Sequence, residues 1–278
     1  MILLAFLFGL LVGSFLNVCI HRWPAEKSVV RPRSRCPECS ESIAWYDNIP
    51  VLSYLALGGR CRRCGASISR RYPLVELLTG LLFVAVVWRF GLTPFAAKAA
   101  LFGSMMLVLV FTDLEQYILP DEVTLGGLAV GLALTPFVPL PAGVTSLFWL
   151  MTHQDPPPWL ASLAESAFAA ALFGGMLWLV REAYYRFRGV DGLGLGDVKM
   201  AAMMGAFWGV GYTLMMLVIG SLAGAVLGTL FVLVAGKRWN YELPFGSYLG
   251  VAAILVMLWG DELLGTYWGL VSGAAAFE

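Results

Sequence analysis

Eight apolar runs, each near the length needed to cross a bilayer, constrain this chain more than any other feature. Roughly 20 consecutive apolar residues span the hydrocarbon core as a helix. The runs lie at 1–20, 74–91, 95–112, 123–140, 164–181, 198–210, 212–235 and 247–268. Only 13% of the residues are charged, whereas soluble domains carry about 25%. The sequence therefore predicts an all-α polytopic membrane protein with about eight transmembrane helices.

Lysine and arginine are distributed unevenly between the connecting loops. With the N-terminus outside, sixteen of the 18 basic residues lie in or beside cytoplasmic loops, and only Arg89 and Lys98 lie outside. Those loops are roughly 21–73, 113–122, 182–197 and 236–246. Because cytoplasmic loops carry an excess of basic residues, this orientation is the one we expect. The net charge is zero and gives no argument for a nucleic-acid partner.

The first apolar run resembles a signal peptide only superficially. No lysine or arginine precedes it, although the n-region of a signal peptide requires a positive charge. The stretch before Cys19 is a weak match to a lipoprotein site, but the bulky Val18 precedes the cysteine. We interpret residues 1–20 as a retained first helix, and Cys19 as a small apolar core residue.

Residues 21–73 differ from the rest of the chain. This segment is polar and basic, with ten lysines and arginines and four of the five cysteines. It predicts a small cytoplasmic domain inserted between the first helix (1–20) and a seven-helix membrane domain (74–278). No internal repeat of 20–50 residues is evident.

The cysteines of this segment form two C-x-x-C pairs, Cys36/Cys39 and Cys61/Cys64, separated by 21 residues. This arrangement is typical of zinc sites. Four thiolates close a tetrahedral site, so one ion would be structural rather than catalytic. Two disulfides or a redox pair are the alternative, which a reducing cytoplasm disfavours.

Two aspartates, Asp113 and Asp197, stand where apolar runs meet the expected cytoplasmic surface. Ionisable groups at such positions are costly and indicate function. Two carboxylates that share one proton can activate water and protonate a leaving amine, as in aspartic proteases. The residues alone do not choose between Asp113 and Asp121 as the partner of Asp197. Asp121 also suits a helix N-terminus, and we prefer that capping role for it.

Glycines precede Asp197 at Gly192, Gly194 and Gly196. Without Cβ atoms, they would let an extended substrate approach the backbone closely. Lys199 is interpreted as neutralising charge, binding a headgroup or extending to the interface. A dinucleotide fingerprint is excluded because no preceding strand or βαβ unit is plausible here.

Two non-proteolytic hypotheses use the same acids. A proton- or cation-coupled transporter would need ionisable groups near the midplane, and the sequence places its acids at one interface. A non-catalytic assembly partner of a pilus or secretion machine would bind pilins without cutting them. The presence of both aspartates argues against it.

The chain resembles the bacterial type IV prepilin peptidases, also called leader peptidase/N-methyltransferases. The two C-x-x-C pairs match this family. The other matching stretches are 13–18 (GSFLNV), 45–54 (WYDNIPVLSY), 68–76 (ISRRYPLVE), 113–121 (DLEQYILPD), 194–199 (GLGDVK) and 244–246 (PFG).

This resemblance implies that Asp113 and Asp197 are the catalytic pair of an aspartic endopeptidase in the bacterial inner membrane. It implies substrates of the prepilin and pseudopilin class, cut after a glycine at the cytoplasmic face. Many members also methylate the new N-terminus with S-adenosylmethionine, an activity associated with the cysteine-containing loop. Asp47 and Glu76 are acids that could contact the amine or the donor, or else pair with nearby arginines. A peptidase without the second activity is the alternative.

Several contacts remain expectations. The basic leader of a substrate would meet Glu115, Asp121 or Glu122, and the 21–73 loop would meet anionic lipid headgroups. The outer loop at 141–163 is longer than is usual in the family, and its Trp149 and Trp159 suit an interfacial aromatic belt. The sequence assigns neither the oligomeric state nor the methyl-donor pocket.

Overall fold

The structure is a computed structural model that describes residues 1–31, 33–140, 143–190, 192–236 and 243–271, with side chains through residue 266. Within these ranges the chain is helical, and six helices are long and apolar enough to cross a membrane. The chain forms two compact units, Met1–Pro120 and Asp121–Glu278. The boundary falls inside the segment 74–278 that we expected to form one membrane domain, so the domain division remains an expectation.

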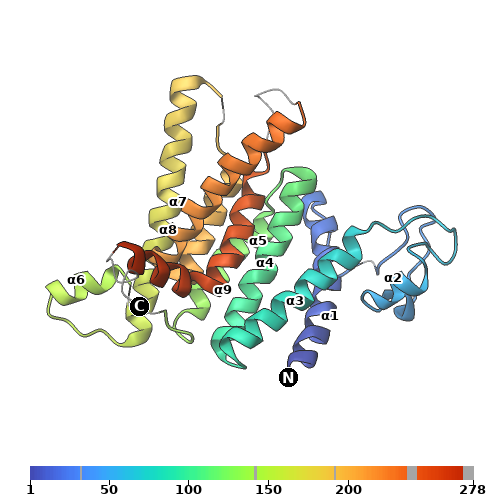
Figure 1. Cartoon of the computed structure of the whole chain (residues 1–278), viewed down its shortest axis with the longest axis horizontal. Coiled ribbons are helices and arrows are strands. Elements are labelled where there is room, and N and C mark those ends of the chain that lie inside the picture. Colours follow the sequence, from blue (N-terminus) through green and yellow to red (C-terminus); the bar gives the residue numbers. More distant parts are fainter. Residues whose placement is uncertain (32, 141–142, 191, 237–242, 272–278) are drawn as a thin grey trace. The chain divides into compact units, whose positions relative to one another are not determined.

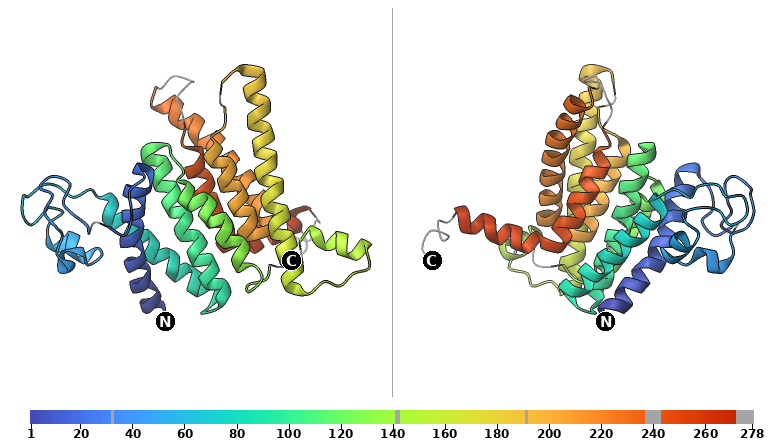
Figure 2. Two further views of the ribbon diagram at one scale, coloured as in Figure 1. Left: turned by 180° about the vertical axis from the view of Figure 1, so that it is seen from behind. Right: turned by 45° about the vertical axis from the view of Figure 1, so that its right-hand side comes forward.

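The first unit consists of three long helices, the first two of which form a hairpin, and a largely irregular segment with short helical turns (Figure 1). α1 packs along α3, and α4 contacts both. Between α1 and α3 the chain leaves the helices for the cysteine-containing segment (Figure 2). The elements are α1 (Ile2–Arg22), η1 (Trp23–Ala25), η2 (Trp45–Asn48), α2 (Leu52–Ala56), α3 (Arg71–Phe90) and α4 (Pro94–Gln116).

Glycines bring α1 and α3 into close contact. A Cβ added to Gly9 would lie 2.8 Å from the Cα of Gly80, and one added to Gly13 would lie 2.7 Å from the Cα of Glu76. Small residues four apart let helix backbones approach in lipid, where association depends on van der Waals packing and interhelical hydrogen bonds. Asn17, one turn further along, donates from Nδ2 to the carbonyl of Tyr72 at 3.0 Å. The hairpin is thus fixed by backbone proximity and by a polar bond.

The second unit is a bundle in which α8 contacts α5, α7 and α9 (Figure 1). Its elements are α5 (Asp121–Leu134), α6 (Thr145–Met151), α7 (Pro158–Arg188), α8 (Leu195–Val234) and α9 (Phe245–Val271). Buried hydroxyls join three of these helices. Ser166 on α7 donates to the Ala206 carbonyl on α8 at 2.7 Å, and its Oγ lies 2.9 Å from the hydroxyl of Thr135, just after α5. Such hydrogen bonds hold helices together where lipid offers no partner.

A break at Gly209 divides α8 into two helices. Gly209 has φ 71° and ψ −171°, a backbone conformation that glycine tolerates and side-chain-bearing residues rarely adopt. Glu165, which is 3% exposed, accepts the N–H of Val210 at 3.0 Å and both the N–H and the hydroxyl of Thr145 at 2.9 and 2.8 Å. One carboxylate therefore satisfies the first N–H after the break and the first N–H of α6.

The expected count of eight spans is supported only in part. The run at 123–140 is helical only to Leu134, because Pro136 and Pro139 lack the N–H that continues a helix. At about 1.5 Å per residue, this 14-residue helix is shorter than the bilayer core. The runs at 198–210 and 212–235 correspond to the two parts of α8, which the break at Gly209 divides. Finally, the expected outer loop at 141–163 contains a helix, α6.

The glycine packing of α1 can be tested by adding one methyl group. We expect Gly13→Ala to lower the free energy of unfolding by about 1–3 kcal/mol, the usual cost of overpacking, because its Cβ meets backbone rather than a movable side-chain tip. Gly175→Ala on α7 is the matched control, since nothing lies within 4 Å of a Cβ added there. Thermal unfolding in detergent measures both. Equal stabilities of the two variants would contradict this packing.

Candidate active site and metal centre

Asp197 lies in the first turn of α8. Gly194 is the N-cap residue, with φ −65° and ψ 141°, and Asp197 is the third residue of the helix. Its side chain is buried, at 8% exposure. A Cβ on Gly194 would lie 3.0 Å from Asp197 Oδ2, so the missing side chain leaves room for this carboxylate. The helix N-terminus also favours negative charge at this position.

Lys199 joins the start of α8 to the start of α5. Its Nζ lies 2.6 and 2.8 Å from the two carboxylate oxygens of Asp121. Asp121 is the first residue of α5, as expected for a helix start, and its side chain forms an ion pair in addition to any capping role. Of the roles considered for Lys199, the structure shows charge neutralisation, with a partner that the sequence did not specify. Lys199 lies two residues after Asp197 in the sequence.

Asp113 lies in the last turn of α4 and is 6% exposed. Its carbonyl accepts the N–H of Tyr117 at 2.9 Å, and Tyr117 ends the helix in the left-handed conformation with φ 56°. Two residues after Asp113, Glu115 pairs with Arg71 at the start of α3. An ion pair therefore joins the α3 and α4 ends beside Asp113.

The two aspartates belong to different compact units, Asp113 to the first and Asp197 to the second. Each is described in its own unit. Their pairing as one catalytic centre stays a prediction, as does the role of Gly196 in substrate approach. Among the described residues, they are the aspartates with buried side chains.

The four cysteines do come together. The Sγ atoms of Cys36, Cys39, Cys61 and Cys64 all lie within 4.8 Å of one another. Cys36 Sγ and Cys64 Sγ are 3.8 Å apart. Zinc–sulfur bonds of ~2.3 Å in a tetrahedron place sulfurs about 3.8 Å apart, whereas a disulfide requires about 2.05 Å. All four cysteines are free, so the geometry fits a metal and not the disulfide alternative.

The two cysteine turns are copies of one another and form a nine-residue repeat, shorter than the 20–50-residue repeats considered in the sequence analysis. The pattern R-C-x-x-C-x-x-S-I occurs at 35–43 and again 25 residues later at 60–68. Each copy has the same bridge, Arg35 with Ser42 and Arg60 with Ser67. The residue after the second cysteine has a positive φ in both copies, 57° at Ser40 and 73° at Gly65. The signal was visible in the sequence, but nine residues are too few for a search aimed at 20–50-residue repeats.

Backbone N–H groups favour the thiolate at Cys61, whereas burial and hydrogen bonds with the other thiols raise the pKa of Cys64 to about 11. Hydrogen bonds from the N–H groups of Cys64 and Arg63 lower the pKa of the Cys61 thiol to about 7. The thiolate is the form that binds metal. Similar N–H bonds close each turn, including Gly65 to the Cys61 carbonyl at 2.9 Å. The turn geometry therefore favours the ligand form of at least one cysteine.

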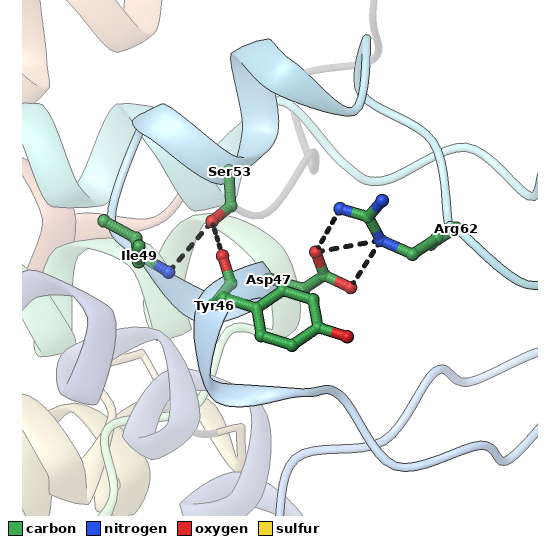
Figure 3. Close-up of polar contacts among 5 residues, drawn as sticks. All are labelled: Tyr46, Asp47, Ile49, Ser53 and Arg62. Atoms are coloured by element: carbon green, nitrogen blue, oxygen red, sulfur yellow. Dashed lines mark hydrogen bonds and ion pairs between the residues drawn. The ribbon is translucent and has the colours of Figure 1, made fainter.

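Asp47 forms a salt bridge with Arg62, which lies between the second pair of cysteines. Arg62 Nη2 and Nε lie 2.7 and 2.9 Å from the Asp47 oxygens (Figure 3). The hydrogen bond from Arg62 lowers the pKa of Asp47 and raises that of the guanidinium. Nearby, Ser53 Oγ donates to the Tyr46 carbonyl and accepts the N–H of Ile49. Of the two roles considered for Asp47, the structure shows pairing with an arginine.

Glu76 connects the cysteine-containing segment to α3. Its Oε2 accepts the N–H of Val51 at 2.8 Å, and the side chain is 7% exposed. Val51 has φ 60°, a strained conformation for a β-branched residue. Glu76 binds a backbone N–H here rather than an arginine. Sequence reasoning missed this contact because nothing in the sequence indicates which residue adopts the strained turn.

Comparison with known proteins decides the family. Residues 7–90 match the model described as the bacterial peptidase A24 N-terminal domain, and residues 100–229 match the type IV leader peptidase family. A protein of Pseudomonas aeruginosa called prepilin leader peptidase/N-methyltransferase is 36% identical, covering 96% of this chain and 93% of its own.

This chain belongs to the type IV leader peptidase family.

Two further relatives carry the same name. The Myxococcus xanthus protein is 43% identical over 91% of this chain and 70% of its own, and the Legionella pneumophila protein is 34% identical over 97% and 95%. No solved structure matches. Both buried aspartates lie in the matched leader-peptidase segment, and all four clustered cysteines lie in the matched N-terminal domain of the family.

The Glu76–Val51 contact can be tested by removing the acceptor. Glu76→Ala leaves the Val51 N–H without its partner, at a cost of about 1–3 kcal/mol. We expect faster proteolytic cleavage between residues 44 and 57. Glu76→Gln retains an acceptor oxygen and should be cleaved at nearly the wild-type rate. Limited proteolysis with mass spectrometry separates the two, and equal cleavage of both variants would exclude the anchoring role.

Proposed function

We propose that this chain is an aspartic endopeptidase that removes the short leader from prepilins or pseudopilins and N-methylates the new N-terminus. The observation that carries the proposal is the burial of Asp113 and Asp197 within the matched leader-peptidase segment. The names of the relatives support both activities.

In the proposed reaction, Asp113 and Asp197 share one proton. One carboxylate takes a proton from water, whose oxygen attacks the carbonyl carbon of the last leader glycine. The other carboxyl group protonates the departing amine nitrogen of the next residue. Each must change protonation state during the cycle. The Lys199–Asp121 and Arg71–Glu115 pairs then act as positioning contacts, because each fixes a helix end that carries one catalytic aspartate.

Recognition of a basic leader needs acidic groups near the site. Glu115 and Asp121 are engaged with Arg71 and Lys199. Glu122 is exposed in the first turn of α5. We therefore favour Glu122 among the three acids as the contact for the leader.

We propose that the enzyme lies in the bacterial inner membrane with its N-terminus outside and its active site at the cytoplasmic face. The charge bias of the loops supports this orientation. In the described part of the chain, six helices are long enough to span, α8 among them. In this topology α5 adds one crossing and the division of α8 at Gly209 adds another, which gives eight passes. Transport would need acids near the midplane, and the candidate catalytic acids lie at helix ends.

We propose that the cysteine cluster holds one structural zinc ion. The sulfur separations and the lowered pKa of Cys61 support it. The ion would fix the two turns, and the surrounding segment would take part in methyl transfer. S-adenosylmethionine would supply the methyl group as a substrate, and its contacts in this chain remain to be assigned.

The peptidase proposal predicts near-complete loss of cleavage on removing either acid. Asp113→Asn and Asp197→Asn should leave a folded protein that does not shorten a prepilin, since neither amide can exchange the required proton. Mass spectrometry of a purified prepilin after incubation measures the product. Asp121→Asn is the control and should retain cleavage, because its amide oxygen can still accept from Lys199 and keep the two helix starts together. Full processing by either of the first two variants would refute the assignment.

The zinc proposal predicts the loss of one metal ion per chain in Cys39→Ser and in Cys64→Ser. Cys19→Ala is the matched control and should keep the ion, because Cys19 is buried in α1. Elemental analysis gives the zinc content, and labelled S-adenosylmethionine reports methylation of the cleaved product. We expect cleavage without methylation in the two serine variants. Normal methylation by a zinc-free variant would show that methyl transfer does not need the cysteine cluster. An absence of methylation by the wild-type protein would support the alternative of a peptidase without the second activity.

A further inference from the structure

A groove lies where α1 ends and the cysteine-containing segment begins. Its volume is about 310 Å³. Arg22 and Arg33 line it together with the polar side chains of Ser34 and Asn48. The remaining lining residues are Val18, Val29, Val30, Ile43 and Trp45. None of the described residues that line this groove is acidic, so the two arginines give it a positive charge.

The positive side chain at its base is held in place. Arg22 Nη1 donates to the Ser28 carbonyl at 2.9 Å. Ser28 Oγ in turn accepts the N–H groups of Val30 and Arg31 at 3.3 and 3.4 Å. These contacts fold the chain after α1 into the wall of the groove. A guanidinium presents its donors in a fixed planar fork that suits phosphate oxygens.

An apolar track leads to this groove. Leu4, Phe8, Leu11 and Phe15 are exposed on α1 by 51–70%. Their spacing of three or four residues places them on one helix face. The next two positions of the same series are Val18 and Arg22, which line the groove. A lipid-facing stripe therefore runs directly into a basic pocket at the helix end.

The cysteine-containing segment also exposes large apolar side chains between residues 45 and 55, of which Trp45 lines the groove. Trp45, Ile49, Leu52 and Leu55 are exposed by 77%, 40%, 64% and 68%. The segment is tied at both ends to membrane helices, α1 and α3, so it is confined to the membrane surface. Exposed apolar side chains with tryptophan at the rim are typical of an element seated in the interface.

We propose that this groove binds one anionic phospholipid. Its phosphate would contact Arg22 and Arg33, and an acyl chain would follow Phe15 and Leu11 along α1. The exposed apolar side chains between residues 45 and 55 would lie among neighbouring lipids. The site is separate from the aspartates and from the cysteine cluster, and it does not depend on the proposed peptidase activity.

Native mass spectrometry of the full chain in detergent tests the proposal. Phosphatidylglycerol and phosphatidylcholine with identical acyl chains are titrated onto the protein. We expect one phosphatidylglycerol to be retained in preference to phosphatidylcholine. The double variant Arg22→Gln/Arg33→Gln should weaken the binding of phosphatidylglycerol about 30-fold. Each basic residue at an anionic surface contributes ~1 kcal/mol to binding, and 1.4 kcal/mol corresponds to a tenfold change in affinity.

The matched control removes the same charge elsewhere in the segment. Arg60→Gln/Arg63→Gln changes two exposed arginines that do not line the groove, and it should bind within about threefold of wild type. If both double variants bound phosphatidylglycerol equally weakly, the effect would come from the total charge of the segment, and the proposed site would be overturned. Equal retention of the two lipids would overturn anion recognition. Tight binding of inorganic phosphate alone would overturn the lipid as occupant.

A second measurement uses only the wild-type chain, in case the groove variant fails to fold. Photoreactive phosphatidylglycerol is crosslinked in vesicles and the labelled peptides are identified. Labels concentrated at residues 11–22 and 29–48 would support the proposal. Labels spread evenly over the lipid-facing helices would overturn it, as would a crosslink from a second copy of the chain across the groove.

Discussion

A backbone N–H group that is buried where the chain leaves a regular helix costs free energy if it has no hydrogen-bond partner. This chain meets the constraint with two buried glutamates. Glu76 accepts the N–H of Val51, where the cysteine-containing segment makes its strained turn. Glu165 accepts the N–H groups of Val210 and Thr145, at the break in α8 and the start of α6. Both departures from regular helix thus depend on a carboxylate from a neighbouring helix.

The catalytic proposal also depends on which polar groups are paired and which are buried. Charged side chains near the aspartates are paired within the chain, Arg71 with Glu115 and Lys199 with Asp121. Asp113 and Asp197 are buried at helix ends instead of being exposed like Asp121. Fixed helix ends with buried carboxylates suit proton exchange with one bound water. The ion pairs are partly exposed, so their main effect would be on orientation rather than on overall stability.

Features set by composition and spacing could be predicted, and those set by tertiary contacts could not. The helical class, the cysteine cluster and the position of Asp197 at a helix start follow from patterns in a single segment. The pairing of Lys199 with Asp121 joins residues 78 positions apart, and nothing local specifies it. The division of α8 was predicted between the runs 198–210 and 212–235, because a glycine-rich stretch separates them, and the break lies at Gly209. The span at 123–140 was overestimated because hydropathy does not register that prolines end the helix before the apolar residues do.

The duplicated cysteine turn has a consequence for how the segment acquires order during synthesis. The first copy emerges with only two ligands, so an ion bound there would keep two coordination positions open. The second copy completes the set after 21 intervening residues. Closing such a loop becomes only ~0.6 kcal/mol more costly with each doubling of its length, far less than the roughly 10–16 kcal/mol of a structural zinc site. Ion capture would therefore order the whole segment in one step, before α4 follows α3 into the membrane.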